Sequence, residues 1–332
     1  MAVLPPYVRP TDRSAELVIA PTWRAGDWNS HGVDCPFAFR RDGKLGMTVV
    51  GWDGIGYQTG VSWFDGRTWS SPTLVLPRDP TSPHRRYNTA LTSILRDNDL
   101  TGDGELVTVD GWHYGTYHAY PQAGYEHGSA VIGIVRSRDL LHWEEHGELL
   151  RPEDGGRWER GGLYKSWLMR HDGRYWLFYN AKDRDDGRWI EQTGAAVSDD
   201  LVHWGRVADE PLLPNGGPGS PDERFASDPC VLRAPDGTWV MFYFGLGGDG
   251  HAQELVAVSD DLVTWVKTGD VLVGVGAPGS LDDWHAHKPS VIRHQDRLHH
   301  YYCAVRRLKS PVDVGGYALP EHRGIGVAWS SL

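Results

Sequence analysis

The sequence predicts an all-β fold, and within that class a single five-bladed β-propeller with four-stranded antiparallel blades. The first observation is a repeated motif, Ser-x-Asp-Leu-x-x-Trp, at residues 137–143, 198–204 and 259–265, whose tryptophans recur every 61 residues. Looser copies lie at residues 62–69 and 327–332, which makes five units. Repeats of about this length that contain short strands are typical of radial propellers.

The second observation is a turn signal inside each unit. An Asp-Gly pair separates two β-rich runs in four units, and Asp-Arg takes its place in the fifth. These pairs are Asp42-Gly43, Asp103-Gly104, Asp172-Gly173, Asp236-Gly237 and Asp296-Arg297. The runs that follow, such as residues 175–179 and 239–244, are aromatic and β-branched and have no helical period. Each unit is therefore predicted to be a four-stranded meander.

The two chain ends complete each other in this prediction. The last unit stops before its fourth strand, whereas residues 15–20 form a strand without a unit of its own. Prolines recur near the start of three first strands, which suits the inner edge of a blade better than an ordinary β-sandwich. They are Pro36, Pro229 and Pro289. We expect one domain, residues 1–332, with blades at 33–75, 86–150, 163–212, 226–275, and 286–332 completed by 15–21.

Composition narrows the function. The formal net charge of −11 disfavours a nucleic-acid partner, because such binding depends on Lys and Arg that neutralise phosphates. No apolar run approaches the roughly 18 residues of a membrane span, and residues 1–15 lack the apolar core of a secretory leader, so we expect a cytoplasmic protein without a membrane partner. Cys35, Cys230 and Cys303 lack paired spacing and are expected to be reduced and buried.

Polar residues open the first strands of the predicted blades. In a propeller these strands surround one axis, so their first residues meet at one end of it. Buried polar and charged groups are costly unless they are paired or functional, and five blades each offer one. The residues are Asp34, Asn88, Lys165, Asp228, and His287 with Lys288. The sequence therefore predicts a polar pocket at this end.

Three segments carry a resemblance to a known group of enzymes. They are residues 34–39 (Asp-Cys-Pro-Phe-Ala-Phe), 225–232 (Phe-Ala-Ser-Asp-Pro-Cys-Val-Leu) and 287–292 (His-Lys-Pro-Ser-Val-Ile). Each precedes a turn and an aromatic strand. Together they resemble the five-bladed hydrolases and phosphorylases of glycoside hydrolase families 32, 43, 68, 117 and 130, and are closest in character to family 43-like glycosidases.

The resemblance implies roles for the carboxylates. Asp34 matches the base or nucleophile of blade one, and Asp228 lies where those families place an acid, although they usually have Glu there. Blade three departs from the pattern, because Lys165-Ser166 stands where an Asp-Pro pair is expected. Glycoside cleavage needs one carboxyl group that keeps its proton and one that is ionised. Asp228 and Glu191 are equal candidates for the acid, and Glu223 is a further one.

The remaining candidates would bind substrate. Residues 110–118 place Trp112 and His113 in an aromatic, glycine-bearing segment that suits a sugar-binding wall, with ordinary packing as the alternative. Lys165, Lys182, His287 and Lys288 would suit a carboxylate-bearing sugar or inorganic phosphate, or would only pair with Asp34 and Asp228. No histidine or cysteine spacing matches a metal site, so neither a metal nor a cofactor is expected.

These observations favour an exo-acting glycoside hydrolase that cleaves a terminal sugar, with furanosides among the substrates considered, and with Asp34 as general base in a single displacement. Two alternatives stay open. One is a glycoside phosphorylase that uses inorganic phosphate. The other is a carbohydrate-binding propeller without catalysis, since blade three has lost its expected acid.

Overall fold

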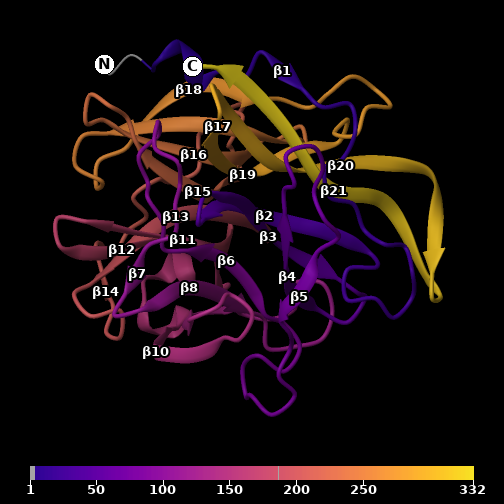
Figure 1. Cartoon of the computed structure of the whole chain (residues 1–332), viewed down its shortest axis with the longest axis horizontal. Helices are drawn as coiled ribbons and strands as arrows, with labels where there is room; N and C mark the ends of the chain where they lie inside the picture. Colours follow the sequence, from indigo (N-terminus) through magenta and orange to yellow (C-terminus); the bar gives the residue numbers. More distant parts are fainter. Residues whose placement is uncertain (1–3, 186) are drawn as a thin grey trace.

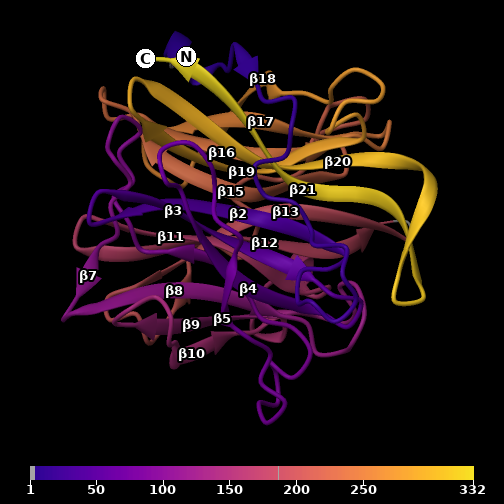
Figure 2. The same cartoon turned by 45° about the vertical axis from the view of Figure 1, so that its right-hand side comes forward.

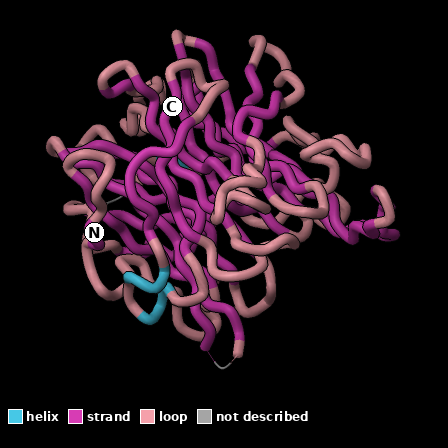
Figure 3. Tube along the Cα trace, turned by 90° about the horizontal axis from the view of Figure 1, so that it is seen from below, coloured by secondary structure: helices cyan, strands magenta, loops and turns pink. Residues whose placement is uncertain are grey.

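The computed structural model describes residues 4–185 and 187–332. In these residues nearly all regular structure is strand, as Figure 3 shows. The helical turns are short 3-10 segments, namely η1 (Pro6–Val8), η2 (Pro152–Asp154) and η3 (Arg157–Glu159). None of the helices in the described part of the chain has the length and apolar character that crossing a membrane requires.

The strands form successive antiparallel groups along the chain (Figures 1 and 2). The first group is β2 (Gly32–Arg41), β3 (Lys44–Trp52), β4 (Tyr57–Trp63) and β5 (Thr73–Leu76). The second is β6 (Ala90–Ile94), β7 (Thr108–Val109), β8 (Trp112–Ala119), β9 (Val131–Ser137) and β10 (Glu144–Leu150). The third is β11 (Leu163–His171), β12 (Arg174–Asp185), β13 (Arg188–Ser198) and β14 (Gly205–Arg206). The fourth is β15 (Phe225–Arg233), β16 (Trp239–Leu246), β17 (Ala252–Ser259) and β18 (Val266–Val273).

The last group joins the two ends of the chain. It contains β19 (His285–His294), β20 (Arg297–Val314), β21 (Tyr317–Ser331) and β1 (Asp12–Arg13). Asp12 pairs with Trp329 in β21, and Ile19 forms an isolated bridge with Ile325. The N-terminal segment thus lies beside the C-terminal strand, but its two-residue ladder precedes the predicted residues 15–20, and only the bridge at Ile19 falls within them.

The first strands of the groups contact one another in a closed ring. β2 contacts β6, β6 contacts β11, β11 contacts β15, β15 contacts β19, and β19 returns to β2. Parallel bridges from β13 to β15 and from β17 to β19 join three groups into one hydrogen-bonded sheet at the start of these inner strands. The inner strands therefore share one axis, and their first residues share one end of it.

The turn signals coincide with hairpin turns in the first, third and fourth groups, whereas in the fifth the turn is Gln295-Asp296, one residue earlier than expected. At Asp42-Gly43 and Asp172-Gly173 both residues have positive φ, the conformation that a tight two-residue hairpin requires. In the second group Asp110-Gly111 has this conformation, with φ of 52° and 76°, in the hairpin that joins β7 to β8. The prediction of Asp103-Gly104 as this turn was wrong, because those residues belong to an inserted segment between β6 and β7.

The repeated motif forms the same outer turn three times. In each copy the motif aspartate accepts hydrogen bonds from two backbone N–H groups that follow it, as Asp139 does from Leu141 and His142. Asp200 and Asp261 do the same, and these hydrogen bonds lower the pKa of all three carboxyl groups. The motif aspartates are therefore structural.

Each inner strand contains a one-residue bulge, where the pairing register skips. The bulges lie between Asp34 and Phe37, Leu91 and Ser93, Tyr164 and Ser166, Ser227 and Cys230, and His287 and Ser290. In three of them a residue with positive φ stands directly before a proline, namely Cys35, Asp228 and Lys288. Such strained backbone re-aims side chains next to functional sites, and a proline is tolerated where the ladder is already broken. Asp228 and Lys288 are thus equivalent positions, and Asp34 precedes its bulge as His287 does.

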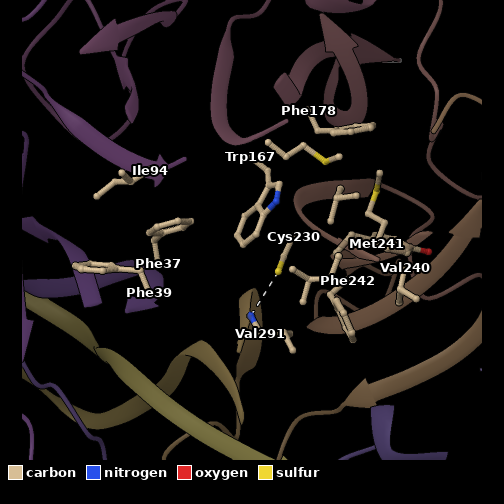
Figure 4. Close-up of a cluster of buried hydrophobic side chains, with 14 of the residues drawn as sticks. Phe37, Phe39, Ile94, Trp167, Phe178, Cys230, Val240, Met241, Phe242 and Val291 are labelled. Atoms are coloured by element: carbon tan, nitrogen blue, oxygen red, sulfur yellow. Dashed lines mark hydrogen bonds between the residues drawn. The ribbon is translucent and has the colours of Figure 1, made fainter. Parts of the chain in front are cut away.

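The core fills the space between the groups. Figure 4 shows part of its largest cluster, in which Phe37, Trp167 and Cys230 come from three different groups, and the Cys230 sulfur accepts a hydrogen bond from the Val291 N–H. The three cysteines are buried and unpaired, as expected. The tryptophans of the repeated motif are only partly buried, and they pack against the outside of these clusters. They are Trp69, Trp143, Trp204 and Trp265.

A segment of residues 96–106 crosses the far end of the inner strands. It exchanges backbone hydrogen bonds with Arg40 at the end of β2 and with Arg233 at the end of β15. Arg293, near the end of β19, donates to the carbonyl of Thr101. Arg96 itself is buried, donates to the carbonyls of Ala38 and Val291, and stacks on Trp167. This segment, called the plug below, ties three inner strands together opposite to their first residues.

We expect Arg96→Met to lower the free energy of unfolding by about 1–3 kcal/mol, because two buried carbonyls lose their donor. Urea unfolding followed by tryptophan fluorescence measures the change. Arg138→Met is the control, since Arg138 also stacks on a tryptophan but is exposed, and its effect should stay within about 0.5 kcal/mol. Equal stability of the Arg96 variant and the wild type would contradict the structural role of the plug.

Candidate active site

Two adjoining cavities lie at the start of the inner strands. The larger, of about 370 Å³, is lined by residues that include Glu191, Asp228, His287 and Lys288. The smaller, of about 220 Å³, is lined by residues that include Asp34, Trp52 and Tyr317. Tyr125 and Arg323 line both cavities and so form the boundary between them. The ring of inner strands therefore brings together residues that are far apart in the sequence.

Asp34 is the centre of a buried ion cluster. Its Oδ2 lies 3.0 Å from Lys288 Nζ and 3.0 Å from Arg323 Nη1, and its Oδ1 accepts a hydrogen bond from the Cys35 N–H. Burial acts to raise the pKa of Asp34, but the two cations outweigh it and hold the pKa well below its usual range. Asp34 is therefore ionised throughout the range in which proteins work.

Glu191 is in the opposite protonation state. It lies on β13, is buried, and its Oε2 accepts a hydrogen bond of 2.7 Å from the Ser227 hydroxyl. Burial raises the pKa of Glu191 to about 7, and the nearby Glu126 and Asp228 add to this effect against Lys182 and the Tyr164 hydroxyl. Near neutral pH a large fraction of Glu191 therefore keeps its proton.

Asp228 presents an unused oxygen. It occupies the bulge of β15 with φ of 54°, is almost fully buried, and its Oδ2 has no hydrogen-bond partner among the described residues. Burial raises its pKa, although Lys165 and Lys288 oppose this. An unpartnered buried carboxylate oxygen beside a cavity is costly, and a bound ligand hydroxyl would satisfy it.

Two lysines, Lys165 and Lys182, lie close to residues that line the larger cavity but do not line it themselves. Lys165 fills the bulge of β11, and its buried Nζ has no hydrogen-bond partner within the described chain. Its backbone N–H donates to Nδ1 of His118, a buried ring whose pKa is lowered to about 3 by burial and by the surrounding lysines. Lys182 lies 3.7 Å from Glu126 and within about 5 Å of the rings of Tyr120 and Tyr164, so it is enclosed by aromatic faces and one carboxylate.

His287 lies on the wall of the larger cavity beside His285. Burial, followed by the charge of Lys288, lowers the pKa of His287 well below its usual range, and His285 is lowered to about 3 in the same way by burial and Arg323. Both rings are therefore neutral. Trp284 lines the same wall, and the Arg307 guanidinium stacks on it. Trp158 precedes β11 as Trp284 precedes β19, but it stacks on Tyr179 in the core and is not part of the wall.

Besides Lys165 and Lys182, four sequence candidates do not line the cavities. Asn88 is fully buried and uses its side chain to bond the backbone of Tyr57, Tyr120 and Gln122, so it fixes a loop. Glu223 accepts the N–H of Gly219 in a surface turn. Trp112 and His113 begin β8 at its other end, beside Ser137 in the outer turn. Arg136 and Arg138 stack on Trp112. The expected sugar-binding wall of Trp112 and His113 was wrong, because no residue of the segment 110–118 lines either cavity.

Sequence reasoning missed four residues that line the site. Tyr125 and Glu126 come from the loop after β8, Tyr164 from β11, and Arg323 from β21. Tyr125 and Tyr164 lie close to candidates in the sequence, since one follows residues 110–118 and the other precedes Lys165. Glu126 and Arg323 carry no local signal, because a loop and a long last strand bring them in. Among the described residues, no three His, Cys, Asp or Glu side chains are grouped as a metal ion requires.

Comparisons with known proteins bear on this arrangement. The family described as "Glycosyl hydrolases family 32 N-terminal domain" matches residues 98–278. The 1,2-beta-oligomannan phosphorylase of Thermoanaerobacter sp. (strain X514) is 28% identical over 130 residues, which are 37% of this chain and 43% of the relative. The sucrose-6-phosphate hydrolase of Klebsiella pneumoniae is 28% identical over 162 residues, 47% of this chain and 33% of the relative. The matched part spans less than half the length of these curated relatives.

The likeness to a solved structure covers far more of the chain. A structure described as "Glycoside hydrolase" is 26% identical, covers 98% of this chain and 93% of that one, and superposes with a TM-score of 0.80. Neighbours of this kind are of the propeller type. The all-β fold is thus shared with proteins of the propeller type.

Proposed function

The chain belongs to the glycosyl hydrolases family 32 N-terminal domain family, and we propose that it is an exo-acting glycoside hydrolase that removes a terminal sugar, with furanoses among the candidates, where the two cavities adjoin. One observation carries this proposal. Glu191 and Asp34 serve one site in opposite protonation states, because burial keeps a proton on Glu191 while two cations keep Asp34 ionised. Two carboxyl groups whose environments push their pKa values apart are what glycoside cleavage requires.

In this proposal Glu191 is the acid. It donates its proton to the oxygen of the leaving group as the glycosidic bond breaks, and Ser227 holds the carboxyl group in place. Asp34 is the ionised partner, acting as general base toward water, and Asp228 binds a sugar hydroxyl through its free Oδ2. Asp228 remains the alternative acid. Glu191 is preferred because Lys165 and Lys288 oppose protonation of Asp228.

The architecture proposed for this enzyme is a single five-bladed propeller over residues 1–332. The closed ring of contacts among β2, β6, β11, β15 and β19 supports five blades. The pairing of β1 with β21 supports closure by the N-terminal segment. Such a ring gives one site to which several blades contribute, and this is the arrangement of the residues described above.

The proposal predicts a pH profile. We expect kcat/KM to fall tenfold per pH unit above about pH 7, because the active form has a protonated Glu191 and burial raises the pKa of this group to about 7. The pKa of Asp34 lies well below its usual range, so its ionisation should not limit the rate between pH 5 and 7. Initial rates with one aryl glycoside from pH 4 to 10 measure the profile. A rate that stays constant from pH 6 to 9 would contradict Glu191 as the acid.

A substrate panel tests the activity itself. Aryl arabinofuranosides, xylosides, galactosides and fructosides should be run with and without inorganic phosphate, and hydrolysis without phosphate is expected for at least one sugar. The similarity to a 1,2-beta-oligomannan phosphorylase and the buried lysines favour one rival, in which phosphate is the attacking group. Dependence on phosphate would establish that rival. Sugar binding without turnover of any member would favour a binding protein.

A further inference from the structure

Two histidines on the wall of the larger cavity have no part in the chemistry proposed above. His285 and His287 lie two residues apart at the start of β19, so their side chains point to the same face of the strand, and both line the cavity. In the described part of the chain, each ring hydrogen-bonds the backbone through Nδ1 and has no partner at Nε2. Both rings are neutral, because burial lowers their pKa values. A neutral imidazole carries one proton, so each free Nε2 is either a donor or an acceptor.

The backbone fixes the position of that proton in opposite ways in the two rings. Nδ1 of His287 lies 3.1 Å from the carbonyl oxygen of Cys303, its cross-strand neighbour. A carbonyl only accepts, so Nδ1 carries the proton and Nε2 of His287 keeps a lone pair. Nδ1 of His285 instead accepts the N–H of Ala252 at 3.1 Å, so the proton of this ring is on Nε2. The wall therefore presents a donor at His285 beside an acceptor at His287.

Ring contacts hold both imidazoles in place. The centroids of the two rings lie 5.4 Å apart. His285 packs edge-on against Trp284 at 5.4 Å, and His287 packs edge-on against Phe244 at 5.2 Å. Turning either ring over would break its bond to the backbone and would disturb these contacts. A few polar groups fixed in this way on a cavity wall determine the orientation and identity of a ligand.

The opposite groups indicate which substituents the wall accepts. One hydroxyl group can accept the hydrogen bond of His285, and a second can donate to His287. A carboxylate offers only acceptors, so it would direct an oxygen lone pair at the lone pair of His287. An ammonium group offers only donors and would direct N–H groups at the N–H of His285. The wall therefore favours neighbouring hydroxyl groups, which a sugar ring carries, over a charged substituent.

We propose that His285 and His287 are specificity-determining residues that recognise two neighbouring hydroxyl groups of the terminal sugar. One hydroxyl oxygen accepts a hydrogen bond from His285, and the other hydroxyl group donates one to His287. The inference rests on the proposed function, because it places the terminal sugar against this wall of the larger cavity. Neither histidine takes part in bond cleavage.

Nitrogen-15 NMR of the imidazoles tests the two protonation sites without any ligand. In histidine-labelled protein near pH 7, His287 should carry its proton on Nδ1 and His285 on Nε2. The variants His285→Gln and His287→Gln assign the two signals by their loss. The same protonation site in both rings, or a charged ring at either position, would overturn the inference.

Fluorinated sugars test the recognition itself, because fluorine accepts a weak hydrogen bond but cannot donate one. Calorimetry with methyl glycosides of arabinofuranose, xylose, galactose and fructose selects the sugar that binds most tightly. Its deoxy and deoxyfluoro analogues are then compared position by position. At the hydroxyl that faces His287, fluorine and hydrogen should weaken binding equally, by about 10-fold. At the neighbouring hydroxyl, which faces His285, fluorine should weaken binding less than hydrogen does.

Variants assign these effects to the two rings. His285→Ala should remove the difference between fluorine and hydrogen, and His287→Ala should remove the loss at the hydroxyl that it faces. His294→Ala is the matched control, since His294 is the last residue of the same strand and lines neither cavity, and it should bind every analogue as the wild type does. Equal losses for fluorine and hydrogen at every position would overturn the inference.

Binding measurements also separate this inference from the proposed function, because calorimetry needs no turnover. A wild type that cleaves no glycoside but shows the expected pattern refutes the hydrolase and retains the recognition by the two histidines. An active enzyme whose analogues show no such pattern refutes the recognition alone. Absence of binding by all four glycosides would refute both.

Discussion

Glu191→Gln is expected to lower kcat by about 10²- to 10⁴-fold on substrates with poor leaving groups, with little change in the free energy of unfolding. The amide keeps the shape and accepts the Ser227 hydroxyl that now bonds Oε2. It has no proton to donate to the leaving oxygen. It also removes a group whose pKa is raised to about 7, so the fall of activity above pH 7 should disappear with it.

The leaving group provides the control for this variant. Dinitrophenolate departs without protonation, so Glu191→Gln should retain most of its activity on a dinitrophenyl glycoside. Asp228→Asn should instead weaken both kinds of substrate alike, because it removes a contact to the sugar. If Asp228→Asn shows the dependence on leaving group and Glu191→Gln does not, the two assignments are reversed. If Glu191→Gln keeps the wild-type rate on every substrate, Glu191 is not the acid.

Asp34→Asn should abolish turnover and also destabilise the protein by about 3–5 kcal/mol. Neutralising this carboxylate removes the charge that Lys288 and Arg323 both contact at 3.0 Å. Arg323 keeps Glu321, but Lys288 is left as a buried cation, and leaving a buried charge unpaired is costly. The substitution is therefore expected to lower stability as well as turnover.

The contribution of Asp34 to the free energy of unfolding should depend on pH. The folded pKa of Asp34 is depressed, so its contribution is complete above the unfolded value of about 3.9 and is lost as the pH falls through the folded value. The stability gap between wild type and Asp34→Asn should be full at pH 7 and narrow below about pH 4. Urea titrations at pH 7 and below pH 4 measure this stability gap. A gap absent at pH 7 would contradict the ion cluster.

A second readout separates catalysis from stability. If Asp34 acts on the reacting centre, azide or formate should restore part of the activity of Asp34→Ala, because a small anion fills the space of the carboxylate. The product separates the two roles: an azide ion at the reacting centre gives a glycosyl azide, whereas an anion that only neutralises Lys288 and Arg323 restores hydrolysis to the free sugar. Asp65→Ala offers a control for the anion effect, since Asp65 is an exposed turn residue that bonds only Arg67 and Thr68.

The sequence predicted the fold from its repeats, and it did so because the repeats are local. The motif aspartates bond backbone groups two and three residues on, so the outer turns need no tertiary information. The inserted plug was missed for the same reason. Asp103-Gly104 looks like a hairpin turn, but the hydrogen bonds of the segment go to Arg40 and Arg233 in other groups.

Most of the candidate residues that line the cavities lie on inner strands, and Glu191 on β13 is the exception. Asp34, Asp228 and Lys288 follow from the strand starts, although the bulges that aim them have no signal beyond the prolines. Glu191 was found from its place in the third strand. Glu126 and Arg323 depend on the path of a loop and of a long last strand, which no local pattern encodes. Asn88 shares the strand start but faces the backbone of Tyr120, because it lies three residues before its strand's bulge begins.

The plug limits how substrate and product can move. Because residues 96–106 cross the inner strands opposite to the site, and Arg96 is buried among three of them, the enclosed space is a dead end. If the chain has the proposed activity, a polymer cannot be threaded through this space and is reached only at a terminus. The released sugar has to leave by the mouth through which it entered, after the remainder of the chain has gone. Product release is therefore ordered, and the free terminal sugar should inhibit by competing with the intact substrate.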